Sequence, residues 1–148
     1  MKDEDRHAFH RGERLEGGSY PAVNAWCADR AAAKAQYGPI ASWNISEITN
    51  MNLLFWLKAG FNEDISRWDV SNVTSLYCAF YGATFFNGDL SRWDVSNVTN
   101  MRYTFDGAAS FQQQLGDAWA RSTAQTTAMS PGSPGSIEGM TTGPSGPP

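Results

Sequence analysis

I-S-R-W-D-V-S-N-V-T, the stretch at residues 65–74, returns almost unchanged as L-S-R-W-D-V-S-N-V-T at residues 90–99. A weaker copy, I-A-S-W-N-I-S-E-I-T, lies at residues 40–49, so the spacing is 25 residues in both directions. A fixed period of this length indicates an array of similar supersecondary units. The sequence therefore predicts three coils, at residues 40–64, 65–89 and 90–114.

Aromatic residues recur at three fixed positions of this repeat. When coils stack, equivalent side chains lie above one another, so each position predicts one column of rings in a shared interior. The predicted columns are Trp43, Trp68 and Trp93; Phe55, Phe80 and Phe105; and Phe61, Phe86 and Phe111. A single coil cannot bury its own apolar face, so these core ladders are expected to stabilise so short an array.

Each coil is expected to hold one short strand and one short helix. Val73, Leu76, Phe80 and Ala83 are spaced three, four and three residues apart, as on one face of a helix that Gly82 ends. The strand is predicted at residues 63–67, the preferred frame, or at residues 67–70. A strand that returns in parallel through a helix winds right-handed. The predicted fold class is therefore α/β, a short right-handed leucine-rich-repeat-like solenoid, whose known periods are roughly 20–29 residues.

The segments that flank the coils differ from them in composition. Residues 1–18 are charged and lack periodic apolar residues, which predicts a disordered lead-in. Residues 19–39 are predicted to form an N-terminal capping helix, started by Ser19 and Pro21 and ended by Gly38. The repeat domain is predicted to extend over residues 40–119, with a fourth coil that begins at Leu115 and decays. Residues 120–148 are rich in Ser, Thr, Gly and Pro and are predicted to form a disordered tail.

Charge and apolar patterning narrow the choice of partner and compartment. The formal net charge of −4 gives no electrostatic reason to expect nucleic acid. The sequence has no apolar run long enough to predict a signal peptide or a membrane segment. A cytoplasmic location is therefore expected by default. A cell-surface or secreted location stays open if the chain is an incomplete gene product. Cys27 and Cys78 form no C-x-x-C pair, and both are interpreted as small buried hydrophobic residues.

Repeated aspartates give the sequence its main candidate for metal chemistry. Asp64, Asp69, Asp89 and Asp94 would lie in stacked pairs, where they either bind calcium or accept hydrogen bonds from turn amides. The second interpretation is preferred, with Arg67 and Arg92 alongside. No metal site or cofactor is therefore expected. The sequence also has no zinc-protease, phosphate-loop or nucleophile motif, which favours a protein that is not an enzyme.

The repeat W-D-V-S-N-V-T-N-M, followed by F, G-A, F-N and D-[IL]-S, resembles the repeat of BspA-like leucine-rich-repeat surface proteins. The resemblance covers residues 40–115, and the preceding A-V-N-A-W-C-A-D and Y-G-P-I also resemble the segment before such repeats. That family includes bacterial surface proteins and lipoproteins, with large expansions in microalgae. Its characterised bacterial members are adhesins that bind host or matrix proteins. The resemblance implies protein binding and assigns no individual binding residue.

The predicted function is a non-catalytic protein-binding repeat module, adhesion-like by resemblance, with a protein partner. The binding surface is expected at the strand-side residues Glu63, Ser66, Arg67, Ser91 and Arg92. Since no polar terminal repeat follows, an uncovered C-terminal coil is expected, which predicts a longer array or self-association. The alternative is a carbohydrate-binding or calcium-stabilised structural repeat of a cell covering, in which the tryptophan ladder would be an exposed platform for sugars.

Overall fold

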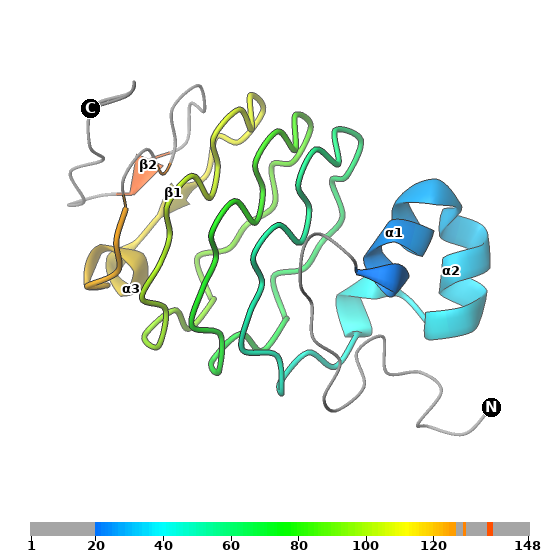
Figure 1. The fold of residues 1–148 in the computed structure, drawn as a ribbon, viewed down its shortest axis with the longest axis horizontal. Helices are drawn as coiled ribbons and strands as arrows, with labels where there is room; N and C mark the ends of the chain where they lie inside the picture. The colour runs from blue at the N-terminus through cyan, green and yellow to red at the C-terminus, as the bar shows by residue number, and fades with distance from the viewer. Residues whose placement is uncertain (1–19, 127–128, 130–135, 138–148) are drawn as a thin grey trace.

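The computed structural model describes residues 20–126, 129 and 136–137, and it shows coils of chain stacked side by side with two helices at the N-terminal end (Figure 1). The predicted lead-in at residues 1–18 and residues 138–148 of the predicted tail lie outside the described residues. The elements in chain order are α1 (Pro21–Ala28), α2 (Arg30–Tyr37), the 3-10 helix η2 (Ile40–Ser42), β1 (Gln114–Leu115), α3 (Asp117–Ala120) and β2 (Ser136–Ile137).

Parallel backbone hydrogen bonds join neighbouring coils at one equivalent position. Isolated parallel bridges pair Asn50 with Ser75, Ser75 with Asn100, and Asn100 with Gln125. The amide that follows each bridge residue donates to the next coil: Met51 N to Ser75 O at 3.0 Å, Leu76 N to Asn100 O at 2.8 Å, and Met101 N to Gln125 O at 2.8 Å. The 25-residue period of the sequence is therefore the register in which successive coils pair.

Polar residues of the repeat also bind the preceding coil. The Trp68 indole donates to Ile40 O at 2.8 Å, and the Trp93 indole donates to Ile65 O at 3.0 Å. The side-chain amides of Asn72 and Asn97 donate to the carbonyls of Ser46 and Ser71, at 2.7 and 2.6 Å. Since buried backbone groups need partners, the two indole bonds explain why Trp recurs in W-D-V-S-N-V-T. The asparagine bonds lie at the surface and join the same neighbouring coils.

All nine rings of the core ladders are buried, with exposed fractions of 4% or less. The Phe80 ring lies 5.2 Å from Phe55 and 5.4 Å from Phe105, in a stacked arrangement. The column beside it repeats this packing, because Phe86 lies 5.8 Å from Phe61 and 6.0 Å from Phe111. Trp43, Trp68 and Trp93 are as buried as the phenylalanines. The interpretation of this tryptophan ladder as an exposed sugar platform is therefore wrong.

The short helix predicted within each coil is replaced by consecutive turns. In the second coil Ala79 N donates to Leu76 O at 3.0 Å and Tyr81 N donates to Cys78 O at 3.2 Å, which are bonds between residues three apart. One residue per coil has a positive φ at the equivalent place, namely Leu53 (63°), Cys78 (55°) and Tyr103 (58°). A left-handed residue cannot continue a right-handed helix. The spacing of Val73, Leu76, Phe80 and Ala83 instead buries all four side chains in a compact turn.

Strand pairing also lies elsewhere in the coil than expected. Residues 63–67 and 67–70 contain no strand, and the bridges at Asn50, Ser75 and Asn100 come directly after the V-T or I-T pair of each repeat. β1 occupies the position equivalent to residues 64–65 and pairs in parallel with β2, with Gln114 opposite Ser136 and Leu115 opposite Ile137. Within the described residues, the preferred frame is therefore realised only at the C-terminal end of the array.

Two helices, and not one, pack on the first coil. α1 and α2 are separated at Asp29, whose carboxylate accepts a hydrogen bond from Ala32 N at 3.1 Å and so caps α2. Ala22, Val23 and Trp26 of α1 are buried, and the Trp26 ring meets the Trp43 ring edge-on at 5.7 Å. The buried Tyr20 donates its hydroxyl to Asn52 O of the first coil. Ser19, the predicted cap, lies outside the described residues.

The fourth coil extends beyond its predicted end. The Trp119 indole stacks on Trp93 with 6.4 Å between ring centres and donates to Leu90 O at 2.9 Å. Further on, Phe105 N donates to Met129 O at 2.7 Å, and Met129 is buried. The turn of helix α3 accommodates the one additional residue that precedes Trp119. The prediction that the coil decays at once, with a disordered tail from residue 120, is therefore wrong for residues 120–126.

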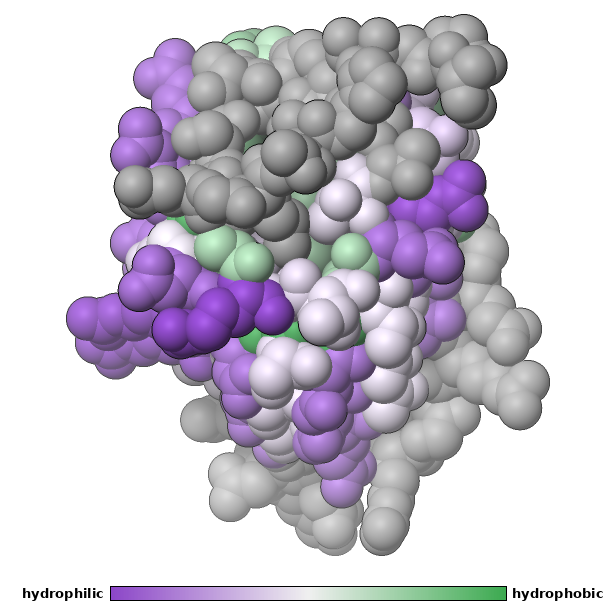
Figure 2. Space-filling model, turned by 90° about the vertical axis from the view of Figure 1, so that its left-hand side faces the viewer, coloured by the Kyte–Doolittle hydropathy of each residue, from purple (hydrophilic) through white to green (hydrophobic). Residues whose placement is uncertain are grey.

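This fourth coil covers the third, because Trp119 stacks on Trp93 and Met129 O accepts from Phe105 N. The predicted uncovered C-terminal coil is therefore the fourth and not the third, and self-association through it stays a prediction. Figure 2 views the molecule from its C-terminal end, and the described surface there is mostly hydrophilic or neutral, with hydrophobic residues confined to small areas.

Candidate functional site

The predicted binding residues lie in turns and not beside strands. Ser66 and Arg67 occupy a turn of the second coil, and Ser91 and Arg92 occupy the equivalent turn of the third. Both arginines are exposed, and the serine amides donate to Asp64 and Asp89 within their own turns. The structure therefore brings the two Ser-Arg pairs into equivalent turns of neighbouring coils.

Glu63, the fifth predicted binding residue, is engaged with a cap helix and not with the two Ser-Arg turns. Its carboxylate forms an ion pair with the Arg30 guanidinium of α2 at 3.2 Å. The exposed fractions of the two side chains are 68% for Arg30 and 27% for Glu63, so solvent screens the pair. Glu63 thus belongs to the contact between the cap helices and the first coil.

The four repeated aspartates Asp64, Asp69, Asp89 and Asp94 accept hydrogen bonds within their turns. In each case Oδ1 accepts from the backbone amide two residues further on, at 2.9–3.0 Å. Hydrogen bonds from the serine hydroxyl and from this amide lower the pKa of all four carboxyls. In the described part of the chain no three His, Cys, Asp or Glu residues lie close enough together to hold a metal ion.

Three large apolar side chains lie exposed on the first two coils, and the sequence analysis missed them. The exposed fractions are 45% for Trp56, 53% for Leu57 and 61% for Phe85. Their backbones belong to paired segments, because Leu57 N donates to Tyr81 O at 2.7 Å and Phe85 N donates to Ala59 O at 3.0 Å. We name Trp56, Leu57 and Phe85 the apolar surface. Trp56 and Leu57 are adjacent in the chain, and the Phe85 amide binds Ala59, two residues after Leu57. Exposed apolar side chains that gather in one region commonly mark a site of protein contact.

Each residue of the apolar surface differs from its equivalents in the other coils. Leu57 stands where the second and third coils have Gly82 and Gly107, and all three have a positive φ, of 56°, 66° and 72°. That backbone conformation suits glycine and is strained for leucine. Phe85 stands where the other coils have Gly60 and Ser110, and Trp56 where they have Tyr81 and Asp106. The signal that could have revealed this surface is the break in the repeat at Leu57 and Phe85, where the other coils have glycine or serine.

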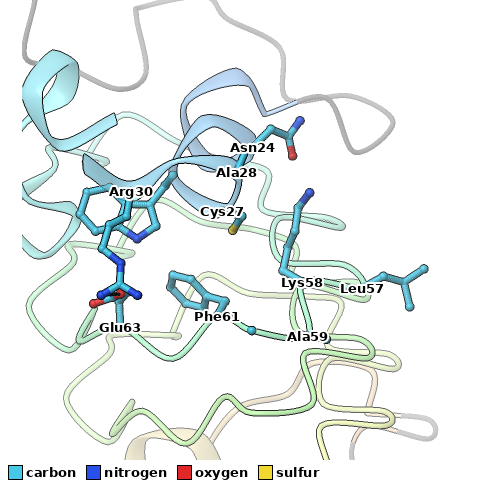
Figure 3. Close-up of a pocket in the computed structure, with 11 residues that line it drawn as sticks. Asn24, Cys27, Ala28, Arg30, Leu57, Lys58, Ala59, Phe61 and Glu63 are labelled. Atoms are coloured by element: carbon cyan, nitrogen blue, oxygen red, sulfur yellow. Dashed lines mark ion pairs between the residues drawn. The ribbon is translucent and has the colours of Figure 1, made fainter. Parts of the chain in front are cut away.

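A pocket of about 580 Å³ lies between the cap helices and the first coil. We name it the cap pocket. Residues of α1 and the start of α2 line one side, and residues 57–61 with Glu63 line the other. Figure 3 shows the Arg30–Glu63 ion pair at one edge and Lys58 at the opposite edge, with Cys27 and Phe61 between them.

Cys27 opens onto this pocket, whereas Cys78 is buried. The interpretation of both cysteines as buried hydrophobic residues is therefore wrong for Cys27, because the break between α1 and α2 leaves it at the edge of the cap. Desolvation raises the pKa of the Cys27 thiol, and the nearby positive charge of Lys58 opposes that effect. A thiol with a raised pKa stays protonated at neutral pH, so it is a poor nucleophile.

The described residues form stacked coils that present side chains from their turns. A family model described as "Mycoplasma protein of unknown function, DUF285" matches residues 27–133, which include part of the cap, all three complete coils and most of the fourth. The chain therefore belongs to the DUF285 family. Searches of the curated proteins and of the solved structures gave no match. None of the helices in the described residues is long and apolar enough to span a bilayer.

Proposed function

We propose that the chain is a non-catalytic protein-binding module, BspA-like and adhesion-like in role, built as a right-handed leucine-rich-repeat-like solenoid. The observation that carries the proposal is the apolar surface. Leu57 keeps a strained backbone and a side chain that is 53% exposed, at a position where two other coils have glycine. Neither feature stabilises the folded chain, and retained strain at a surface turn is a reason to infer function.

The neighbours of Leu57 support a contact with another protein. Trp56 and Phe85 are the residue types that contribute most to binding energy at protein interfaces, because each buries a large rigid ring at little entropic cost. Both lie on backbone that is hydrogen-bonded within the stack, so the surface is held in place before any partner arrives. The carbohydrate-binding alternative loses its original support, since the tryptophan ladder is buried.

A variant that restores the repeat at the apolar surface tests this function. Trp56→Asp, Leu57→Gly and Phe85→Ser together install the residues that the third coil carries at these positions. The fold should persist because the third coil already folds with them. The matched control replaces one exposed arginine of the fourth coil, Arg121→Ser, which belongs neither to the predicted binding turns nor to the apolar surface.

The measurement is affinity capture from cell-surface extracts, followed by binding of each captured protein in purified form. We expect purified partners to bind the wild-type chain and the arginine control, and to bind the repeat-restored variant at least tenfold more weakly. Equal binding by all three chains would show that the apolar surface is not the contact. Binding to a glycan array, with no protein partner, would favour the carbohydrate alternative.

A further inference from the structure

We propose that the cap pocket binds an extended, acceptor-rich peptide segment of a protein partner, which takes the place of a preceding coil. The inference rests on the proposed protein-binding function and adds a second contact site to it. It is argued from the backbone donors of the first coil, from the Trp26 indole and from the charge of the pocket.

The first coil has no coil before it, so its outward donors have no backbone to bind. In the second coil, Phe85 N donates to Ala59 O at 3.0 Å and Asn87 N donates to Asn62 Oδ1 at 2.9 Å. The third coil repeats both bonds: Ser110 N donates to Thr84 O at 3.0 Å, and Gln112 N donates to Asn87 Oδ1 at 2.9 Å. The equivalent amides of the first coil are those of Gly60 and Asn62. Neither amide has an acceptor among the described residues.

Repeat symmetry directs these two amides away from the second coil, toward the side of the cap helices. Gly60 itself lines the cap pocket, and a Cβ atom added to it would meet nothing within 4 Å. A ligand backbone therefore has room to approach the Gly60 amide. This edge is the kind to which an extended peptide adds, with its carbonyls accepting from main-chain amides.

Trp26 supplies an unpaired side-chain donor in the same pocket as the Gly60 amide. Its side chain is only 6% exposed and lines the pocket, and its Nε1 is buried with no acceptor among the described residues. The indoles of Trp68, Trp93 and Trp119 each donate to a main-chain carbonyl, as shown by the bonds to Ile40, Ile65 and Leu90. A buried donor without a partner destabilises a fold, so a ligand oxygen that accepts from Trp26 would bind favourably.

The charge of the pocket adds a preference for an acidic peptide. Glu63 is paired with Arg30, whereas Lys58 forms no ion pair within the described part of the chain. Lys58 stands at the edge opposite that pair, and Phe61 provides an apolar floor (Figure 3). The pocket thus combines two neutral donors, the Gly60 amide and the Trp26 indole, with one unpaired ammonium group, and the Asn62 amide lies beside its lining. An extended segment with two accepting oxygens and a carboxylate complements all of them.

The stack itself suggests a probe. For the third coil, the accepting role is played by residues 82–89, G-A-T-F-F-N-G-D, which contain Thr84 O, Asn87 Oδ1 and an acidic end. A fluorescent peptide of this sequence is titrated with the full chain, and anisotropy reports binding. A second peptide with leucine in place of its asparagine removes one acceptor.

Two glycine substitutions make a matched pair of protein variants. Gly60→Leu places a side chain in the open space of the pocket. Gly116→Leu adds the same side chain at the opposite end of the array, outside the pocket, where an added Cβ also meets nothing within 4 Å. We expect Gly60→Leu to weaken the peptide at least tenfold and Gly116→Leu to leave it unchanged. The Gly60 amide and the Trp26 indole N–H should shift in ¹⁵N NMR spectra on binding.

Three results would overturn the proposal: no binding of the peptide at millimolar concentration, binding that Gly60→Leu does not alter, or equal binding of the leucine peptide. Self-association that Gly60→Leu abolishes would replace the protein partner by a second copy of this chain. Phe85 lies outside the pocket, so Phe85→Ser should leave peptide binding unchanged. If captured partners still bind while the peptide does not, the pocket proposal fails and the proposed function stands. If the peptide binds while no partner depends on the apolar surface, the pocket proposal stands and the apolar surface is not the contact.

Discussion

The second and third coils differ from the first in how many of their hydrogen-bond donors and apolar side chains are paired or buried within the stack. In the two later coils, apolar ladder residues are buried and outward amides bind the coil before. The ladder indole donates to a carbonyl in all three coils. The first coil shares their ladders, yet it has Leu57 in a glycine conformation and leaves the amides of Gly60 and Asn62 without acceptors among the described residues. The three coils share most of their residues, so the few positions at which the first coil differs can be compared directly with their equivalents.

This difference separates stability from function. Positions that recur in every coil contribute to the stack, and their substitution should lower the free energy of unfolding. Positions at which one coil departs from the others contribute little to the stack and are the places where a partner can be recognised. A substitution at a recurring position and one at a departing position should therefore differ in their effect on stability.

The largest effect is expected from the phenylalanine ladder. Phe80 is completely buried between Phe55 and Phe105, so Phe80→Ala should lower the free energy of unfolding by about 3–5 kcal/mol. Phe85→Ala, which removes a side chain that is 61% exposed, should change it by less than about 0.5 kcal/mol. Denaturation in guanidinium chloride measures both. Similar losses for the two variants would mean that Phe85 packs against the stack and is not a binding residue.

A smaller loss is expected when an indole loses its hydrogen bond. Trp93→Phe keeps an aromatic ring but leaves Ile65 O without its donor in a buried position, which should cost roughly 1–3 kcal/mol. Trp56→Phe, at a position 45% exposed, should leave stability nearly unchanged and lower partner affinity only modestly. The same denaturation experiment compares them. A Trp93→Phe variant as stable as the wild type would show that water replaces the indole donor.

Acid should weaken the turns of the later coils. The folded-state pKa of Asp64, Asp69, Asp89 and Asp94 is lowered, so their hydrogen bonds stabilise the fold above the unfolded-state pKa near ~3.9, and that stability is lost as pH falls through the folded-state pKa. Asp106, whose pKa is raised by desolvation, contributes in the opposite sense. Calorimetry should give a melting temperature that is level between neutral pH and about pH 5 and that falls below about pH 4.

The matched variant is Asp69→Asn with Asp94→Asn, which keeps an accepting oxygen but removes two titrating groups. It should show a smaller fall in melting temperature in acid. An equal fall would assign the acid effect to other groups. Calcium at neutral pH should leave the wild-type melting temperature unchanged, and a rise that the double variant abolishes would restore the calcium interpretation.

The sequence was most informative where identical residues recur. The 25-residue spacing predicts which rings share a column, because equal spacing places equivalent residues at the same height in every coil. It could not distinguish a helix from a compact turn, since both bury residues spaced three and four apart. The left-handed backbone at Cys78 decides between them, and cysteine gives no warning of a positive φ.

The candidate site was less predictable from the sequence, because the repeat pattern indicates recurring residues as the candidates for binding. Ser66, Arg67, Ser91 and Arg92 attracted attention for that reason, yet both serines are engaged in turns. The break at Asp29 that exposes Cys27, and the free amide of Gly60, depend on where the cap helices lie. Trp119 stands one position later than the 25-residue spacing requires, so the sequence predicts a decaying fourth coil, whereas a turn of helix restores the place of Trp119 in the stack.

The smallest effect expected on stability has the opposite sign. Leu57→Gly removes the strain of a left-handed leucine, which costs roughly 1–2 kcal/mol, and adds the backbone entropy of glycine, so unfolding should become harder by up to about 1 kcal/mol. The converse change, Gly82→Ala, should destabilise, because φ is 66° and the new Cβ would lie 2.7 Å from Leu57 Cδ2. In the Leu57→Gly variant, Gly82→Ala should cost less, since that side chain is gone. Denaturation of the two single variants and the double variant measures this coupling.

A gain in stability together with weaker partner binding is the trade expected when a strained residue is kept for recognition. If Leu57→Gly lowered stability instead, Leu57 would be a packing residue of the first coil, and the distinction drawn between its departures and the regular coils would fail at the position that best supports it.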